Sequence, residues 1–88
     1  MRLVWTRNFL QDYADWKNFN PHIRDRIDRL IEAVAAHPKP AIGKPEKLRY
    51  LKNTFALRIT QEHRLIYRLC RKDATIELLS CYGHYDGR

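Results

Sequence analysis

The fold of this chain is decided by residues 55–70, FALRITQEHRLIYRLC. In the first part of this stretch, apolar side chains at positions 55, 57 and 59 alternate with Ala56, Arg58 and Thr60. After the polar residues 60–63, the alternation resumes with apolar side chains at 65, 67 and 69. A period of two is typical of strands with one buried face. The stretch therefore predicts two antiparallel strands joined by a turn at Thr60–His63.

Further strands are predicted on both sides of this hairpin. Lys72-Asp73 is a natural turn, and residues 74–82 have the composition of a last strand. At the start of the chain, residues 2–5 (RLVW) are β-branched and aromatic in character and predict a short opening strand. The expected sheet is a twisted antiparallel one of about four to five strands.

Two helices are predicted between the opening strand and the proline-rich, basic segment 38–45. Thr6 is a suitable N-cap, and Phe9, Tyr13 and Trp16 then form an apolar stripe. Asn20-Pro21 begins a second helix, which ends by His37-Pro38. Its apolar positions are Ile23, Ile27, Leu30, Ile31 and Val34. We expect a single α+β domain over residues 1–88, with both helices on one face of the sheet.

The two cysteines are predicted to be unbridged. A two-residue turn at Lys72-Asp73 would place Cys70 opposite Thr75 and Cys81 opposite Arg64, too far apart for a disulfide. Unbridged strand cysteines suit a reducing cytoplasm, and we interpret them as small buried residues. Neither has the spacing of a metal ligand, so we expect no metal and no cofactor.

Positive charge is concentrated in the middle of the chain. The 88 residues carry 17 Lys and Arg against 10 Asp and Glu, a net charge of +7. Residues 39–72 hold ten of these cations against Glu46 and Glu62, a net of +8. The apolar runs are too short for a membrane span, and no signal peptide develops after Met1. The charge suits either a solvated surface or, as we favour, a surface that binds the phosphates of a nucleic acid.

Residues suited to RNA cleavage converge at one end of the predicted sheet. Arg58 and Arg64 flank the turn, and His84-Tyr85 leaves the last strand at the same end after Gly83. An odd-length loop would place the two arginines on one face, and an even-length loop would not. Attack of a ribose 2′-hydroxyl on phosphate needs a base, an acid and cations around the transition state. Glu46 in the basic loop completes such a set.

Three segments of the chain resemble the YoeB/Txe toxins of the RelE/ParE superfamily: KPEKL at 44–48, RITQEHRLIY at 58–67 and HY at 84–85. The family consists of toxins of toxin–antitoxin pairs that cut messenger RNA in the ribosomal A site. The resemblance implies a small twisted antiparallel sheet with two helices packed against it. Our leading hypothesis is a ribosome-dependent endoribonuclease toxin that cuts by metal-independent acid–base chemistry and leaves a 2′,3′-cyclic phosphate, and the unbridged cysteines suit a cytoplasmic protein.

The resemblance also implies a role for each candidate residue. Glu46 corresponds to the general base, Arg64 to the arginine that stabilises the transition state and Arg58 to a phosphate-binding arginine. His84 corresponds to the general acid and Tyr85 to the terminal tyrosine that contacts the substrate.

The resemblance implies partners as well. The expected partners are messenger RNA, the ribosome and a cognate antitoxin similar to YefM or Axe, and a homodimer is an open alternative. Gly83 and the extension Asp86-Gly87-Arg88 depart from the family pattern. The residues expected to bind nucleic acid are Lys44, Lys47, Arg49 and Lys52.

Alternative interpretations of the chain stay open at this point. Arg58 and Arg64 would then form surface ion pairs with Glu62 or Glu77, and Glu46 would be a counter-ion of neighbouring lysines. Histidines other than His84 would be structural, and Tyr50, Tyr67 and Tyr82 would be half-buried strand residues. In function, the alternatives are a ParE-like toxin that binds DNA gyrase without catalysis, and a non-catalytic RNA-binding module.

Overall fold

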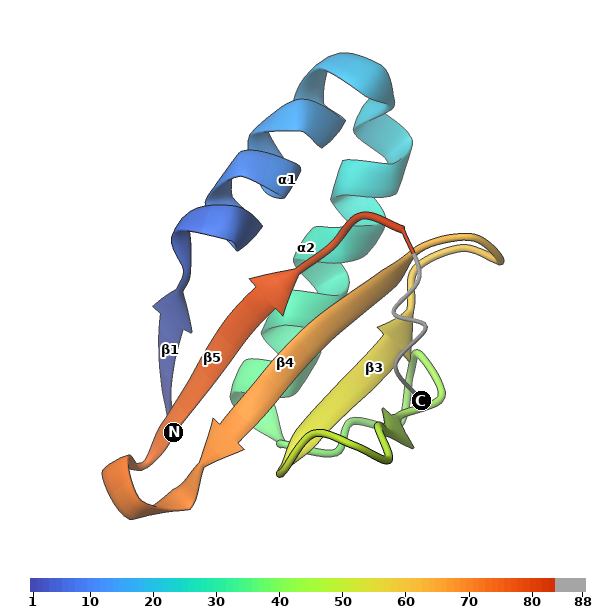
Figure 1. Ribbon diagram of the computed structural model, residues 1–88. Helices are drawn as coiled ribbons and strands as arrows, with labels where there is room; N and C mark the ends of the chain where they lie inside the picture. The colour runs from blue at the N-terminus through green and yellow to red at the C-terminus, as the bar shows by residue number, and fades with distance from the viewer. Residues whose placement is uncertain (84–88) are drawn as a thin grey trace.

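The computed structural model describes residues 1–83, in which two helices lie against one face of a five-stranded sheet (Figure 1). The elements are β1 (Arg2–Trp5), α1 (Arg7–Phe19), α2 (Pro21–Ala36), β2 (Glu46–Lys47), β3 (Thr54–Arg58), β4 (Arg64–Cys70), a 3-10 turn (Arg71–Asp73) and β5 (Thr75–Ser80). The strand order is β1-β5-β4-β3-β2. The α+β architecture, with both helices on one face, is therefore as predicted.

The hairpin of β3 and β4 forms the centre of the core. Its odd-numbered apolar side chains pack against the helices, and Leu57, Leu65 and Tyr67 are completely buried. Its even-numbered residues point to the opposite face, because side chains alternate along a strand. No helix among the described residues covers that second face (Figure 1).

The helices begin and end where the sequence predicts. Thr6 Oγ1 accepts a hydrogen bond from Phe9 N at the start of α1, and the Asn20 side chain accepts from His22 N at the start of α2. Phe9 and Trp16 of α1 are buried. From α2, the buried side chains are Ile27, Leu30, Ile31 and Val34. Neither helix, in the part of the chain that is described, is both long and apolar enough to cross a membrane.

The sheet is mixed and not purely antiparallel, because β1 pairs in parallel with β5. A tight turn forces neighbouring strands to run in opposite directions. The strand β1 is separated from its partner by most of the chain, so no turn constrains its direction. This is the first correction to the sequence-based prediction.

A β-bulge gives the second correction. Cys70 lies opposite Thr75 as predicted, but the register shifts between Ile66 and Tyr67, where Tyr67 pairs with Leu78 and Ile66 pairs with Ser80. The extra residue moves the following chain by one position. The predicted pairing of Cys81 with Arg64 is therefore wrong, and Arg64 N instead donates to Gly83 O at 3.0 Å. Gly83 still lies at the predicted end of the sheet.

Both cysteines are free, as expected, but only one is a buried apolar residue. Cys81 is fully buried, and burial raises the pKa of its thiol well above the usual range. Cys70 is half-buried, and its Sγ donates to Glu77 Oε1 at 3.3 Å. The prediction for Cys70 is wrong because its strand position faces the uncovered side of the sheet.

The three tyrosines also differ from the prediction of half-buried strand residues. Tyr67 is completely buried, and burial raises its pKa to about 12. Its hydroxyl donates to Pro38 O at 2.5 Å. Tyr50 and Tyr82 lie outside the strands and are 73% and 54% exposed.

The segment between α2 and β2 is attached to the hairpin by Gly43. Gly43 O accepts a hydrogen bond from Arg58 N at 2.7 Å. Gly43 has φ +80°, and a Cβ at this position would lie 3.0 Å from Leu30 Cδ2 and 3.1 Å from Leu57 Cβ. The backbone conformation and the close approach both require glycine.

We predict that Gly43→Ala lowers the free energy of unfolding by about 2 to 4 kcal/mol, through backbone strain and overpacking together. Gly83→Ala is the matched control, since Gly83 has φ +78° but, chain neighbours aside, no heavy atom of residues 1–83 lies within 4 Å of the place a Cβ would take. It should lose only about 1 kcal/mol. Urea unfolding of both variants measures the difference, and equal losses would contradict the packing argument.

Candidate active site

Arg58 and Arg64 lie directly opposite each other in the ladder between β3 and β4. The five residues 59–63 connect them, so the loop is odd in length and the two arginines share a face. This answers the question that turn length left open. The shared face is the one turned away from the helices, on which Arg58 is exposed and Arg64 is half-buried.

Glu46 stands on the same face, in the neighbouring row. It pairs with Ala56, which in turn pairs with Ile66, and residues opposite each other in a sheet point to the same side. The row of Arg58 and Arg64 follows two residues later, about 7 Å along the strands. The Glu46 side chain is exposed on the short edge strand β2. A carboxylate and two guanidinium groups thus share one end of the uncovered face.

The guanidinium of Arg64 is oriented by the backbone of the β3–β4 loop. Its Nη1 donates to three carbonyl oxygens: Thr60 O at 2.7 Å, His63 O at 3.0 Å and Gln61 O at 3.2 Å. A guanidinium carries five N–H donors on three nitrogens. Because the loop engages Nη1, the Nε–Nη2 edge is the one suited to a bidentate contact with phosphate.

Arg58 is held through its backbone. Its N–H donates to Gly43 O, and its carbonyl accepts from Arg26 Nη2 of α2 at 3.3 Å. These contacts connect the end of β3 to both the preceding loop and the helix layer.

The ion pairs proposed as alternative roles are not formed within residues 1–83. The one salt bridge there joins Arg68 and Glu77, and the hydrogen bond from Arg68 lowers the pKa of Glu77. Neither Arg58 nor Arg64 pairs with Glu62 or Glu77, and Glu46 has no salt bridge with Lys44 or Lys47 in this part of the chain.

The chain after β5 is fixed at its backbone by α1 and by the β3–β4 loop. Cys81 N donates to Asp12 Oδ2 at 3.0 Å, and Trp16 Nε1 donates to Cys81 O at 2.7 Å. Gly83 N then donates to His63 Nδ1 at 2.8 Å. Figure 1 shows this segment turning toward the loop that joins β3 and β4. The next residues, including the candidates His84 and Tyr85 and the extension Asp86-Gly87-Arg88, lie outside the described residues.

The four predicted nucleic-acid-binding residues lie in or near β2 and in the loop that follows it. Lys44, Lys47, Arg49 and Lys52 are all exposed. Leu48 between them is buried against Ala56 and Ile66, so the apolar side chain anchors the segment while its cations face the solvent. No group of three His, Cys, Asp or Glu side chains within residues 1–83 is arranged to hold a metal ion.

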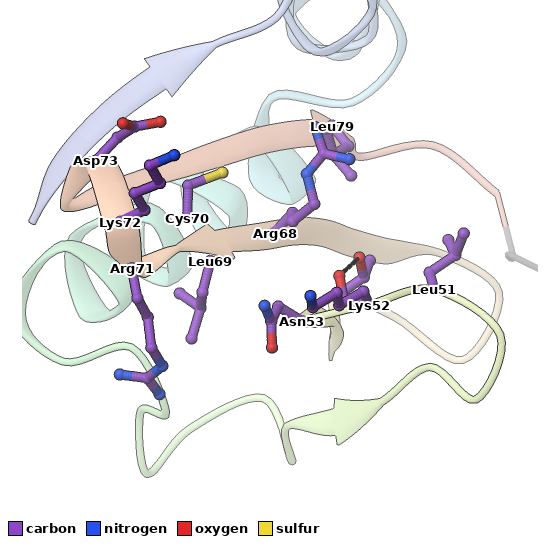
Figure 2. A pocket seen from close by; sticks show the side chains of 11 residues that line it. Leu51, Lys52, Asn53, Arg68, Leu69, Cys70, Arg71, Lys72, Asp73 and Leu79 are labelled. Carbon is purple, nitrogen blue, oxygen red and sulfur yellow. Dashed lines mark hydrogen bonds between the residues drawn. The ribbon is translucent and has the colours of Figure 1, made fainter.

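A hollow of about 460 Å³ lies farther along the uncovered face (Figure 2). Lys52 and Asn53 lie on one side of it, and Arg71 and Lys72 lie at its end near the turn between β4 and β5. Its cations also include Arg68, which is four residues, or about 13 Å, along β4 from Arg64. Arg68, Arg71 and Lys72 are not among the predicted binding residues, although they belong to the ten cations of residues 39–72.

Similar proteins and solved structures identify the family of this chain. A family model described as a YoeB-like toxin of bacterial type II toxin-antitoxin systems matches residues 5–85. The chain belongs to this family. Toxin YoeB of Escherichia coli (strain K12) is 34% identical over 86 residues, which cover 97% of this chain and 100% of that protein. The resemblance seen in the sequence is therefore confirmed.

Solved structures of the family have the same fold as this toxin. The YoeB/ParE toxin from Agrobacterium tumefaciens superposes with a TM-score of 0.88 at 34% identity, covering 97% of this chain and 100% of that one. The Staphylococcus aureus YoeB of a YoeB-YefM complex gives 0.81 at 30% identity, covering 97% and 98%. A YoeB dimer from Staphylococcus aureus gives 0.83 at 29% identity, again covering 97% and 98%.

The contact of Asp12 with Cys81 has a predictable pH signature in this toxin. Burial raises the pKa of Asp12 from its usual 3.8, an effect that the hydrogen bond from Cys81 N only partly offsets. A carboxyl whose pKa is higher in the folded state is harder to ionise there, so it lowers stability as pH rises from about 3.8 through the folded value.

We predict that the stability of the wild type falls relative to that of Asp12→Asn across this pH window and then stays level. Asparagine keeps an acceptor oxygen for Cys81 N but does not titrate. Unfolding free energies of the two proteins, measured in parallel from pH 3 to pH 7, test the prediction. A relative gain by the wild type would mean that the hydrogen bond outweighs burial.

Proposed function

We propose that this toxin is a ribosome-dependent endoribonuclease that cuts messenger RNA in the ribosomal A site and so inhibits translation. The observation that carries the proposal is the direct pairing of Arg58 with Arg64. Two like charges directly opposite each other destabilise a sheet. An anion bound between them relieves this repulsion, and a phosphodiester is an anion of suitable shape for two guanidinium groups.

The remaining groups of the candidate set supply the acid–base chemistry. Glu46 takes the proton of the ribose 2′-hydroxyl, and the 2′-oxygen then forms a bond to phosphorus. The bond from phosphorus to the 5′-oxygen breaks, and His84 gives its proton to that oxygen. The products are a 2′,3′-cyclic phosphate and a 5′-hydroxyl, and no metal or cofactor enters the reaction.

Electrostatic stabilisation comes from the two arginines. The loop carbonyls orient the guanidinium of Arg64 before substrate binds. Little reorganisation is therefore needed when the phosphate becomes pentacoordinate in the transition state. Arg58, on the neighbouring strand β3, binds a second oxygen of the same phosphate. Tyr85 contacts the substrate after His84, in a role that we take from the family resemblance.

The cations around β2 bind the rest of the RNA. Lys44, Lys47, Arg49 and Lys52 neutralise neighbouring phosphates, and the binding should weaken as salt concentration rises. The ribosome presents a single-stranded codon to the face of the sheet that is turned away from the helices (Figure 1).

The partner of this toxin is, we propose, a YefM- or Axe-like antitoxin, which blocks the basic face. The YoeB-YefM complex of Staphylococcus aureus supports this assignment, and the YoeB dimer of the same organism supports a homodimer as a second assembly. A reducing cytoplasm is the compartment that suits the two free cysteines.

We predict that Arg64→Ala and His84→Ala each reduce cleavage of messenger RNA on translating ribosomes by at least about 100-fold, because each removes a group that acts in the transition state. Sequencing of RNA 5′ ends from cells that express each variant measures the loss. With the active toxin, the new ends should cluster at one position within codons.

Arg29→Ala is the matched control, since Arg29 is an exposed arginine of α2 on the helix side of the molecule. It should cut like the wild type. If Arg64→Ala still cleaves and still arrests growth, the site assignment is wrong. DNA breaks without new RNA ends would support a gyrase-directed toxin instead, and RNA binding without cleavage would support a binding module.

A further inference from the structure

We propose that His63 is a positioning residue, which holds the backbone at Gly83 and so fixes the point from which the chain continues into His84. This inference rests on the proposed function, in which His84 is the general acid. His63 itself touches neither substrate nor reacting atoms in this role.

The ring of His63 has a defined place and a defined acceptor. Its Nδ1 accepts from Gly83 N at 2.8 Å. The ring lies edge-on to Trp16, with centroids 4.7 Å apart and planes at 85°, and it lies 4.8 Å from the ring of Tyr82. Contacts with two aromatic rings restrict its rotation, so Nδ1 stays directed at Gly83.

The hydrogen bond also specifies the protonation state of the ring. Nδ1 accepts only when it carries no proton, so His63 is the neutral tautomer with its proton on Nε2. This tautomer is observable by NMR without any measurement of activity.

The backbone of His63 contacts the other half of the candidate site. Its carbonyl accepts from Arg64 Nη1 at 3.0 Å and from Ile59 N at 3.0 Å. Thr60 Oγ1 accepts from His63 N and Glu62 N, both at 3.1 Å, which fixes the shape of the loop. One residue therefore contacts both the guanidinium of Arg64 and the segment that leads to His84.

The backbone of Gly83 is flexible by itself, so a contact is needed to hold it in one conformation. Its φ of +78° is a conformation that glycine adopts freely, and among the described residues, chain neighbours aside, no heavy atom lies within 4 Å of the place a Cβ would take. The contacts of Asp12 and Trp16 fix residue 81, two positions earlier. Within the described part of the chain, Gly83 forms hydrogen bonds with His63 Nδ1 and with Arg64 N.

The test replaces His63 with each of two amide side chains, asparagine and glutamine, which differ in length by one methylene group. In His63→Asn, Oδ1 occupies the position of Nδ1 and can accept from Gly83 N. In His63→Gln, the acceptor lies one bond farther out and misses that position. His37→Gln is the control, because His37 Nδ1 also accepts a backbone N–H, from Lys39 at 3.1 Å, at the end of α2 and outside the candidate site.

We expect His63→Gln to lower kcat for cleavage on translating ribosomes by about 10- to 100-fold with KM little changed, as for a displaced catalytic group. His63→Asn should stay within about threefold of the wild type on the same scale. His37→Gln should have no effect. Amide hydrogen exchange at Gly83 should be slow in the wild type and in His63→Asn, and faster in His63→Gln.

The outcomes distinguish a failure of the positioning role of His63 from a failure of the proposed ribonuclease function. Full activity of His63→Gln, or loss of activity in His63→Asn with Gly83 still protected, overturns the positioning role alone. Fast exchange at Gly83 in the wild type, or a proton on His63 Nδ1 in its NMR spectrum, would show that the hydrogen bond from Gly83 N to His63 Nδ1 does not form, and would also overturn the positioning role. A wild-type protein that does not cleave messenger RNA overturns the proposed function, while the exchange data still report on the contact.

Discussion

The pairing of Arg58 with Arg64 is the constraint on which the candidate site depends. It follows from a five-residue connection between two strands whose odd-numbered side chains are buried against the helices. Because burial of Leu57 and Leu65 sets the register, neither arginine can turn toward the core without exposing an apolar row. The repulsion between the two guanidinium groups is thus maintained by the hydrophobic core. A local electrostatic cost of this kind is expected at a functional site, and it supports the proposed binding of phosphate between the two arginines.

Two further attachments hold Glu46 and the described end of the chain near this pair. Gly43 binds the backbone of Arg58 and leads the chain into β2, where Glu46 lies beside Ala56. On the other side, Asp12 and Trp16 of α1 bind the backbone at Cys81. The helices therefore do more than cover the core, since α1 also directs the chain that follows β5. These contacts are made by backbone groups and by the side chains of Asp12 and Trp16, so the exposed side chains of the candidate site remain available to a ligand.

Much of this fold could be predicted from the sequence because its signals are local. Thr6 and Asn20 cap helices by bonding to N–H groups two or three residues away, and strand alternation is visible within residues 55–70. The parallel direction of β1 and the bulge beside Ile66 and Tyr67 were not predictable in this way. Both depend on partners distant in the sequence, and one added residue is enough to change every later pairing.

The sequence by itself determined the chemistry of this protein: the residue types, the basic middle segment and the motifs that indicate a YoeB-like toxin. Only the tertiary structure decided that Arg58 and Arg64 share a face with Glu46, and that His63 reaches Gly83. Periodicity describes which side of its own strand a residue occupies. Which residues from different elements meet is decided by register, loop length and packing, because these contacts form only when the whole core assembles.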